Sequence, residues 1–250
     1  MTRWIPALLA AAMAFASGIV QAQTLRWASQ GDPQTMDPHS QNEQLTNAMN
    51  GQVYEFLIAR DRKLELVPQL ATEWKQTSPL QWRMKLRPNV KFQDGTPFTA
   101  DDVVFSINRA KLPTSQIAVY ANAVGEVKRV DDLTVEFNLS QVNPIFLQHI
   151  NTLSIMSKAW SEKHNVTKPL DFKNKEESYA AYNANGTGPF MLVKRYPDVK
   201  TVYKRNPNYW GKVQGNVQEV VFTPIASAST RVAALLSGQL DAAWARWSRP

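Results

Sequence analysis

The segment Leu66–Ala110, LVPQLATEWKQTSPLQWRMKLRPNVKFQDGTPFTADDVVFSINRA, decides the fold of this chain. Apolar and polar residues alternate in it over eight positions: Leu80, Gln81, Trp82, Arg83, Met84, Lys85, Leu86 and Arg87. A period of two places the apolar side chains on one face of a strand and the charged ones on the other. The sequence therefore predicts a strand in a half-buried sheet.

A turn, a short strand, a second turn and a helix are predicted to follow. Residues 90–92 form the short strand, and Gly95 supplies the positive φ of the second turn. Thr99 is the predicted N-cap of the helix, with Asp101 and Asp102 in the first turn, where the helix dipole favours negative charge. The apolar residues of this helix share one face: Val103, Val104, Ile107 and Ala110.

Periodicity and turn residues predict the remaining elements. Alternation indicates a strand at 24–28 and a hairpin over 127–139, and turn residues separate further predicted strands at 190–194, 201–204 and 217–224. Helical spacing indicates helices over 44–58, from Asn143-Pro144, near 176–183, and from Ser229 or Thr230 to Gly238. Together they predict an α/β fold, a mixed twisted sheet with flanking helices and a small hairpin-rich subdomain over about 66–139.

The sequences of five segments resemble those of the extracellular solute-binding proteins of family 5, the oligopeptide- and dipeptide-binding family. These segments are PQLATEW (68–74), KFQDGTPFTADDV (91–103), GTGPF (186–190), RNPNYW (205–210) and TRVAALLSGQLD (230–241). The resemblance implies a periplasmic-binding-protein-like fold of type II, with two lobes around a ligand cleft. Family members are much longer, so we expect an apparently truncated product in which residues 23–241 form the N-terminal lobe, the second lobe is largely absent, and 242–250 form an atypical tail.

The first 22 residues have the composition of an export signal. Arg3 supplies positive charge, residues 5–15 form a short apolar run, and Val20-Gln21-Ala22 fits signal peptidase. The run is shorter than the ~20 residues that cross a bilayer, so cleavage after Ala22 is favoured over a membrane anchor. The chain has no cysteine, which excludes disulfides and the lipidated cysteine of many relatives. We expect an unlipidated periplasmic protein.

Composition and spacing argue against nucleic-acid binding and catalysis. The net charge is +7, but lysines and arginines are scattered and lack the clustering that nucleic acids require. His39, His149 and His164 form no metal-ligand pattern. Gly186-Thr187-Gly188 lacks the lysine of a phosphate loop, and adjacent Asp101 and Asp102 fit helix capping. We expect no catalytic residue, no metal and no cofactor.

The resemblance places the cleft beside the loop that follows the first strand. The corresponding residues here are Ser29, Gln30, Gly31 and Asp32, with Gln41 and Asn42 behind them and Tyr120 and Gly188 as further candidates. Polar side chains of this kind suit peptide amides, and Asp32 suits an amino terminus. The alternative is that they satisfy the loop backbone, and the sequence leaves both open.

The function that the resemblance implies is capture of a solute for import. A monomer binds a peptide by lobe closure and delivers it to the inner-membrane permease of an ABC transporter. Alternatives within the architecture are a nickel chelate, an opine or an oligosaccharide as ligand. Alternatives from other classes are a secreted hydrolase and an inactive fragment.

Overall fold

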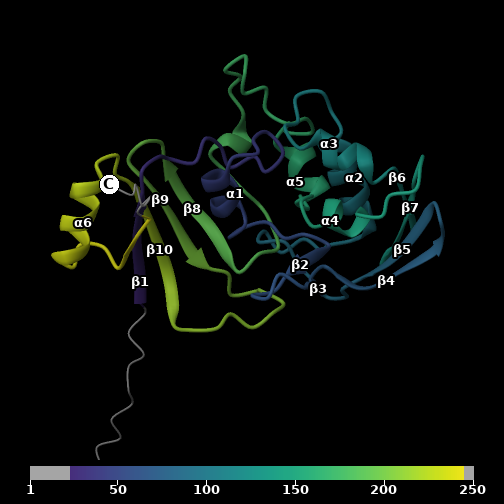
Figure 1. Cartoon of the computed structure of the whole chain (residues 1–250), viewed down its shortest axis with the longest axis horizontal. Coiled ribbons are helices and arrows are strands. Elements are labelled where there is room, and N and C mark those ends of the chain that lie inside the picture. Colours follow the sequence, from purple (N-terminus) through teal and green to yellow (C-terminus); the bar gives the residue numbers. More distant parts are fainter. Residues whose placement is uncertain (1–22, 245–250) are drawn as a thin grey trace, which may run out of the picture.

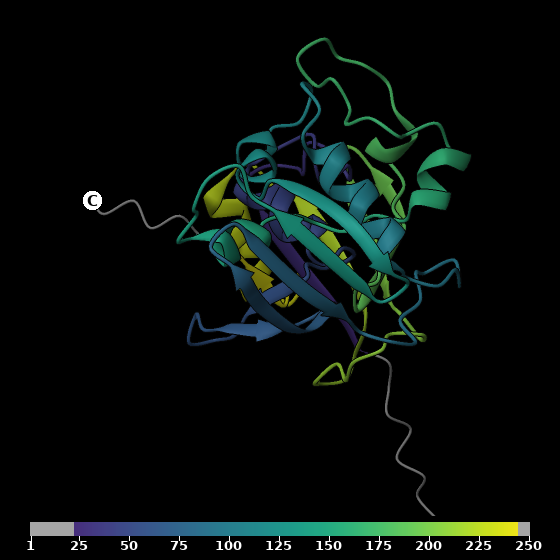
Figure 2. The same ribbon diagram turned by 90° about the vertical axis from the view of Figure 1, so that its right-hand side faces the viewer.

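Residues 23–244, which the computed structural model describes, form two main β-sheets and a two-stranded ribbon (Figure 1). The predicted signal peptide over 1–22 and residues 245–250 of the predicted tail lie outside the described residues. In Figure 1 the five-stranded sheet lies at the left and the four-stranded sheet at the right, with the ribbon between them. Figure 2 faces the four-stranded sheet, with the five-stranded sheet behind it.

The five-stranded sheet is mixed and has the order β11-β1-β10-β9-β8. β1 pairs in parallel with both β10 and β11, whereas β10-β9 and β9-β8 are antiparallel pairs. The strands are β1 (Gln23–Ser29), β8 (Phe190–Tyr196), β9 (Lys200–Arg205), β10 (Val217–Pro224) and β11 (Ala242–Ala243). Residues from opposite ends of the described chain therefore pair in one sheet, with β11 at its edge.

The four-stranded sheet is antiparallel, in the order β4-β5-β7-β6. Its strands are β4 (Ala71–Ser78), β5 (Gln81–Leu86), β6 (Glu126–Asp131) and β7 (Thr134–Asn138), and the ribbon consists of β2 (Ile58–Arg60) and β3 (Leu66–Pro68). The predicted alternation holds in β5, because Met84 and Leu86 are buried while Arg83 and Lys85 are exposed.

Six α-helices and one 3₁₀ turn are found in residues 23–244. They are α1 (Gln44–Asn50), α2 (Ala100–Ala110), α3 (Ala118–Ala123), α4 (Phe146–Ile150), α5 (Lys158–Lys163), the 3₁₀ turn Tyr179–Ala181 and α6 (Ala228–Leu236). Thr99 is the N-cap of α2 as predicted, and its N–H donates to Asp102 Oδ2 at 2.9 Å. Gly95 has the predicted positive φ, at 86°.

Each main sheet has its own buried core. Met84 and Phe137 of the four-stranded sheet pack with Val103 and Ile107 of α2. Under the five-stranded sheet, Phe222 and Tyr203 belong to a second cluster that also contains Met49 and Tyr54 from α1 and the turn after it. The loop after β1 and the start of α1 are therefore held against the five-stranded sheet.

Several local predictions were wrong. The helix predicted near 176–183 is only the 3₁₀ turn Tyr179–Ala181, and the helix predicted from Asn143-Pro144 begins at Phe146. The helix predicted over 44–58 ends at Asn50, and residues 58–60 form a strand. Its apolar spacing arises because the chain crosses between cores: Met49 and Val53 belong to one and Leu57 to the other. The strand predicted at 90–92 is only an isolated bridge, Lys91 to Pro97. The last helix is capped by Ser227, whose hydroxyl accepts from Thr230 N, and not by Ser229 or Thr230.

A buried ion pair connects α2 to the loop after β1. The side chains of Arg109 and Asp37 are both 0 % exposed, and the guanidinium donates to Asp37 Oδ1 at 2.9 Å and Oδ2 at 2.6 Å. Arg109 also donates to the carbonyls of Val166 and Lys168. Burial alone would raise the pKa of Asp37, but Arg109 holds that pKa at about 2.

His39 completes this cluster as a neutral imidazole. Its Nε2 lies 2.9 Å from Ser154 O, and its Nδ1 lies 3.1 Å from Arg109 Nη1. Because a carbonyl only accepts and a guanidinium only donates, Nε2 carries the proton and Nδ1 accepts. Burial, together with the Arg109 charge, lowers the pKa of His39 to about 4.

The depressed pKa of His39 predicts that the protein loses stability as the pH falls from about 6.5 to about 4. In this window the unfolded chain binds a proton that the folded chain excludes, so the free energy of unfolding drops by up to about 1.4 kcal/mol per pH unit. Urea unfolding at several pH values measures this slope. His39→Gln keeps a donor and an acceptor without titrating, so its slope should be smaller than that of the parent. Equal slopes in the parent and His39→Gln would contradict the assignment.

Candidate ligand-binding site

Three parallel strands end at one edge of the five-stranded sheet. β1 ends at Ser29, β10 at Pro224 and β11 at Ala243. The strand ends are tied together, because Ile225 N donates to Ser29 O at 2.9 Å and Trp244 N donates to Ala28 O at 2.8 Å. In open α/β sheets, ligands bind outside the carboxyl ends of the strands. This edge is therefore the place to look for a site.

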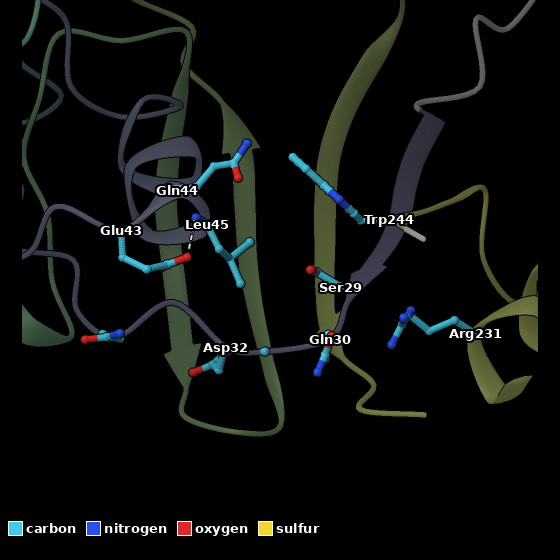
Figure 3. Close-up of a pocket in the computed structure, with 10 residues that line it drawn as sticks. Ser29, Gln30, Asp32, Glu43, Gln44, Leu45, Arg231 and Trp244 are labelled. Atoms are coloured by element: carbon cyan, nitrogen blue, oxygen red, sulfur yellow. Dashed lines mark hydrogen bonds between the residues drawn. The ribbon is translucent and has the colours of Figure 1, made fainter. Parts of the chain in front are cut away.

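A cavity of about 530 Å³ lies at this edge (Figure 3). Its walls come from the loop after β1, the start of α1 and the side of α6, and they consist of Ser29, Gln30, Gly31, Asp32, Gln34, Glu43, Gln44, Leu45, Arg231 and Trp244. The volume falls within the range of roughly 300–1,000 Å³ that is common for small-molecule sites. Ser29, Gln30, Gln34 and Gln44 supply hydroxyl and amide groups, and Leu45 and Trp244 are the large apolar members of the lining.

Asp32 is fixed by an arginine at the base of this loop. Its side chain is 7 % exposed, and Oδ2 lies 2.9 Å from Arg195 Nη2. Arg195 also donates to the carbonyl of Pro33, and Asp198 N donates to Asp32 Oδ2. Burial raises the pKa of Asp32, which the Asp198 N–H and Arg195 offset only in part. The pair holds the loop after β1 in place, so much of the charge of Asp32 is already compensated.

Glu43 is committed to the start of α1. Its Oε1 accepts from Leu45 N and its Oε2 from Thr46 N, each at 2.8 Å (Figure 3). Although burial opposes it, these N–H groups lower the pKa of Glu43, so the carboxylate stays charged. Glu43 therefore shapes the wall of the cavity, and its carboxylate is already bound by main-chain N–H groups.

Residues 65–249 match the sequence model of the bacterial extracellular solute-binding proteins, family 5 Middle. The chain belongs to this family. The resemblance seen in the sequence is thereby confirmed, and the fold is of the type II periplasmic-binding-protein kind, as predicted.

Individual members of family 5 match most of this chain. It is 27 % identical to the periplasmic oligopeptide-binding protein OppA of Escherichia coli K12 over 95 % of its length, covering 47 % of that protein. It is 31 % identical to the dipeptide-binding protein of the same organism over 86 % of its length, covering 43 % of that protein. The crystal structure of NikZ from Campylobacter jejuni in complex with Ni(L-His) superposes with a TM-score of 0.77 at 26 % identity, covering 88 % of this chain and 43 % of NikZ. The chain thus spans about half the length of these relatives, each of which is a binding protein and not an enzyme.

The other residues predicted for the site lie away from the main cavity of this family 5 chain. Asn42 and Tyr120 line a smaller cavity of about 190 Å³, and half-buried Gln41 directly precedes Asn42. Gly188 packs against the turn after α1, where its N–H donates to Val53 O at 2.8 Å. The structure therefore brings the four loop residues 29–32 together at the cavity and leaves these four outside it.

Sequence reasoning missed six lining residues, which are Gln34, Glu43, Gln44, Leu45, Arg231 and Trp244; Arg231 is the buried cation among them. It lies in the first turn of α6, is 3 % exposed, and points into the cavity toward Gln30 in Figure 3. Its Nη1 donates to Ile225 O at 2.5 Å and Ala226 O at 3.0 Å. Only the path of the chain places it here, because β1 and α6 are far apart in sequence. The sequence around Arg231 predicts a helix, but it does not indicate that the arginine side chain is buried.

Residues 23–244 contain no group of three or more histidine, aspartate or glutamate side chains placed to hold a metal ion. Within the same residues, no helix has the length and apolar character needed to cross a membrane.

Proposed function

We propose that this family 5 chain captures a small solute in the periplasm, with a peptide as the first choice, and presents it to the permease of an ABC importer. The observation that carries the proposal is the cavity at the carboxyl ends of the parallel strands, which residues 29–32 line together with three glutamine side chains. The names of the oligopeptide- and dipeptide-binding relatives support a peptide as cargo.

The lining suits the main chain of a peptide. Each peptide unit offers one donor and one acceptor, and the side-chain amides of Gln30, Gln34 and Gln44 supply both. Bridging water can complete such contacts without selecting one side chain, as a peptide carrier of broad range requires. No lining residue is a histidine, so a metal would have to enter as a preformed chelate.

The proposal includes the rest of the organisation inferred from the sequence. Residues 1–22 act as a cleaved signal peptide without lipidation, 23–241 form one lobe with the subdomain at about 66–139, and 242–250 are an atypical tail. The protein works as a monomer, and preferential docking of the ligand-loaded form on the permease delivers the cargo. Nucleic acid, metal and cofactor play no part.

Calorimetry of the full chain tests this function. Pools of di-, tri- and tetrapeptides should give saturable heats, whereas oligosaccharides should give none. Gln30→Ala removes one hydrogen-bonding amide from the cavity and should weaken peptide binding about fivefold. Gln76→Ala, an exposed glutamine of β4, is the control and should not change affinity.

Other outcomes distinguish the alternatives. Binding of Ni(L-His) or an oligosaccharide without peptide binding would move the cargo to another solute class. Peptide turnover at catalytic protein concentration would replace the proposal by a hydrolase. If none of these ligands bound or reacted, the proposed function would be wrong for this chain.

A further inference from the structure

Arg231 is a buried cation without an acidic partner among residues 23–244. The other two buried arginines of the described chain are each paired with an aspartate: Arg109 with Asp37 and Arg195 with Asp32. Arg231 has no such counter-charge. It donates only to two main-chain carbonyls, and its buried Nε has no hydrogen-bond partner in the described chain. Because a guanidinium stays protonated in a protein, its burial without a counter-charge is costly.

The cavity itself offers no anion to satisfy this cation. Its two carboxylates are Asp32 and Glu43. Asp32 is bound by Arg195, and Glu43 caps α1 through two N–H groups. Both acids therefore have other partners, although Oδ1 of Asp32 is buried without one. Neither forms an ion pair with Arg231, which points from α6 toward Gln30 (Figure 3).

The main-chain contacts of Arg231 set its direction. Nη1 is held by the carbonyls of Ile225 and Ala226, in the connection between β10 and α6. Nε is itself buried, so Nη2 is the guanidinium nitrogen left for an acceptor from the cavity, and a carboxylate oxygen suits such a charged donor. Leu45 and Trp244 lie in the same cavity and can contact the apolar part of a solute.

We propose that Arg231 is the anchor for a carboxylate group of the captured solute, an inference that rests on the solute-binding function proposed above. In a peptide, the carboxylate comes from the C-terminus or from an acidic side chain. The cavity thus selects anionic or zwitterionic solutes over neutral ones of the same shape. The glutamine amides hydrogen-bond the main chain of the solute, and Arg231 pairs with its negative charge.

The test compares trialanine with its C-terminal amide on the full chain by calorimetry. The acid should bind about tenfold or more tightly, because a hydrogen-bonded charge pair contributes more than a neutral contact. An amidated tripeptide with a central glutamate shows whether an acidic side chain replaces the C-terminus. Arg231→Gln should remove the preference for the acid, and Arg231→Lys should keep part of it.

Arg205→Gln is the matched control. This half-buried arginine also donates only to main-chain carbonyls, those of Val213 and Gly215, but does not line the cavity. Its substitution should leave the acid-to-amide ratio unchanged. Equal affinity of the parent chain for acid and amide, or a preference that survives in Arg231→Gln, would overturn the anchor while leaving peptide binding intact.

A second measurement is independent of peptide binding. Sodium acetate should raise the Tm of the parent more than sodium chloride at equal ionic strength, and this excess should vanish in Arg231→Gln. If peptides failed to bind but the acetate effect were present, the proposed function would fail and the anion site would stand. If acetate stabilised the parent and Arg231→Gln equally, the anion site would be wrong.

Discussion

Arg109→Met is expected to lower the free energy of unfolding by about 3–5 kcal/mol. The substitution leaves Asp37, whose side chain is 0 % exposed, as a buried carboxylate without its cation. It also removes the donors to the carbonyls of Val166 and Lys168, so the loop after β1, α2 and the segment near 168 lose their common contact. Urea unfolding of the parent and variant measures the loss.

Two further variants separate the buried charge from a general effect of losing an arginine. Arg129→Met removes two exposed ion pairs, with Asp101 and Asp132, and should cost no more than about 1 kcal/mol because exposed pairs are weak. Adding Asp37→Asn to Arg109→Met removes the stranded charge but keeps an acceptor for Leu170 N, which donates to Asp37 Oδ2. The double variant should be more stable than Arg109→Met alone. Similar losses of unfolding free energy in Arg109→Met and Arg129→Met would show that the buried ion pair stabilises the protein no more than an exposed one.

The secondary structure was predictable where one face of an element is buried and the other exposed. β5 and α2 meet this condition: Met84 alternates with exposed neighbours, and Val103 and Ile107 share the buried face of the helix. β1 was found for the same reason, since Leu25 and Trp27 alternate with exposed Thr24 and Arg26. The prediction failed over 44–58, because there the apolar residues serve two different cores and their spacing imitates one helix.

The candidate site was predictable only in part. Residues 29–32 follow a strand that the alternation pattern identifies, and the family resemblance placed them at the cleft. Arg231 and Trp244 come from distant segments, and they join the cavity only because β10 and β11 pair with β1. Long-range pairing of this kind leaves no local pattern, so neither residue could be assigned to the site beforehand. The buried pair of Asp37 and Arg109 was missed for the same reason, since 72 positions separate its members.

The packing of the loop at 186–190, the GTGPF motif, explains its two glycines. The loop packs on the turn after α1: Gly188 N donates to Val53 O at 2.8 Å, and Phe190 N donates to Gln52 O at 3.0 Å. A Cβ on Gly186 would lie 2.0 Å from Val53 O, and one on Gly188 would lie 2.6 Å from the same atom. The close approach of two main chains, and not contact with a ligand, accounts for both glycines in this structure.

Gly186→Ala should therefore lower the free energy of unfolding by about 3 kcal/mol or more. The clash is with main-chain atoms, and Val53 O cannot retreat without losing its hydrogen bond from Gly188. Gly31→Ala is the matched control, because a Cβ there meets nothing within 4 Å and its φ is not in the left-handed region. That substitution should be neutral, or stabilising by up to about 1 kcal/mol through the unfolded chain. Urea unfolding of both variants gives the comparison; if Gly186→Ala proved as stable as Gly31→Ala, the two segments would not approach each other as closely as the structure has them.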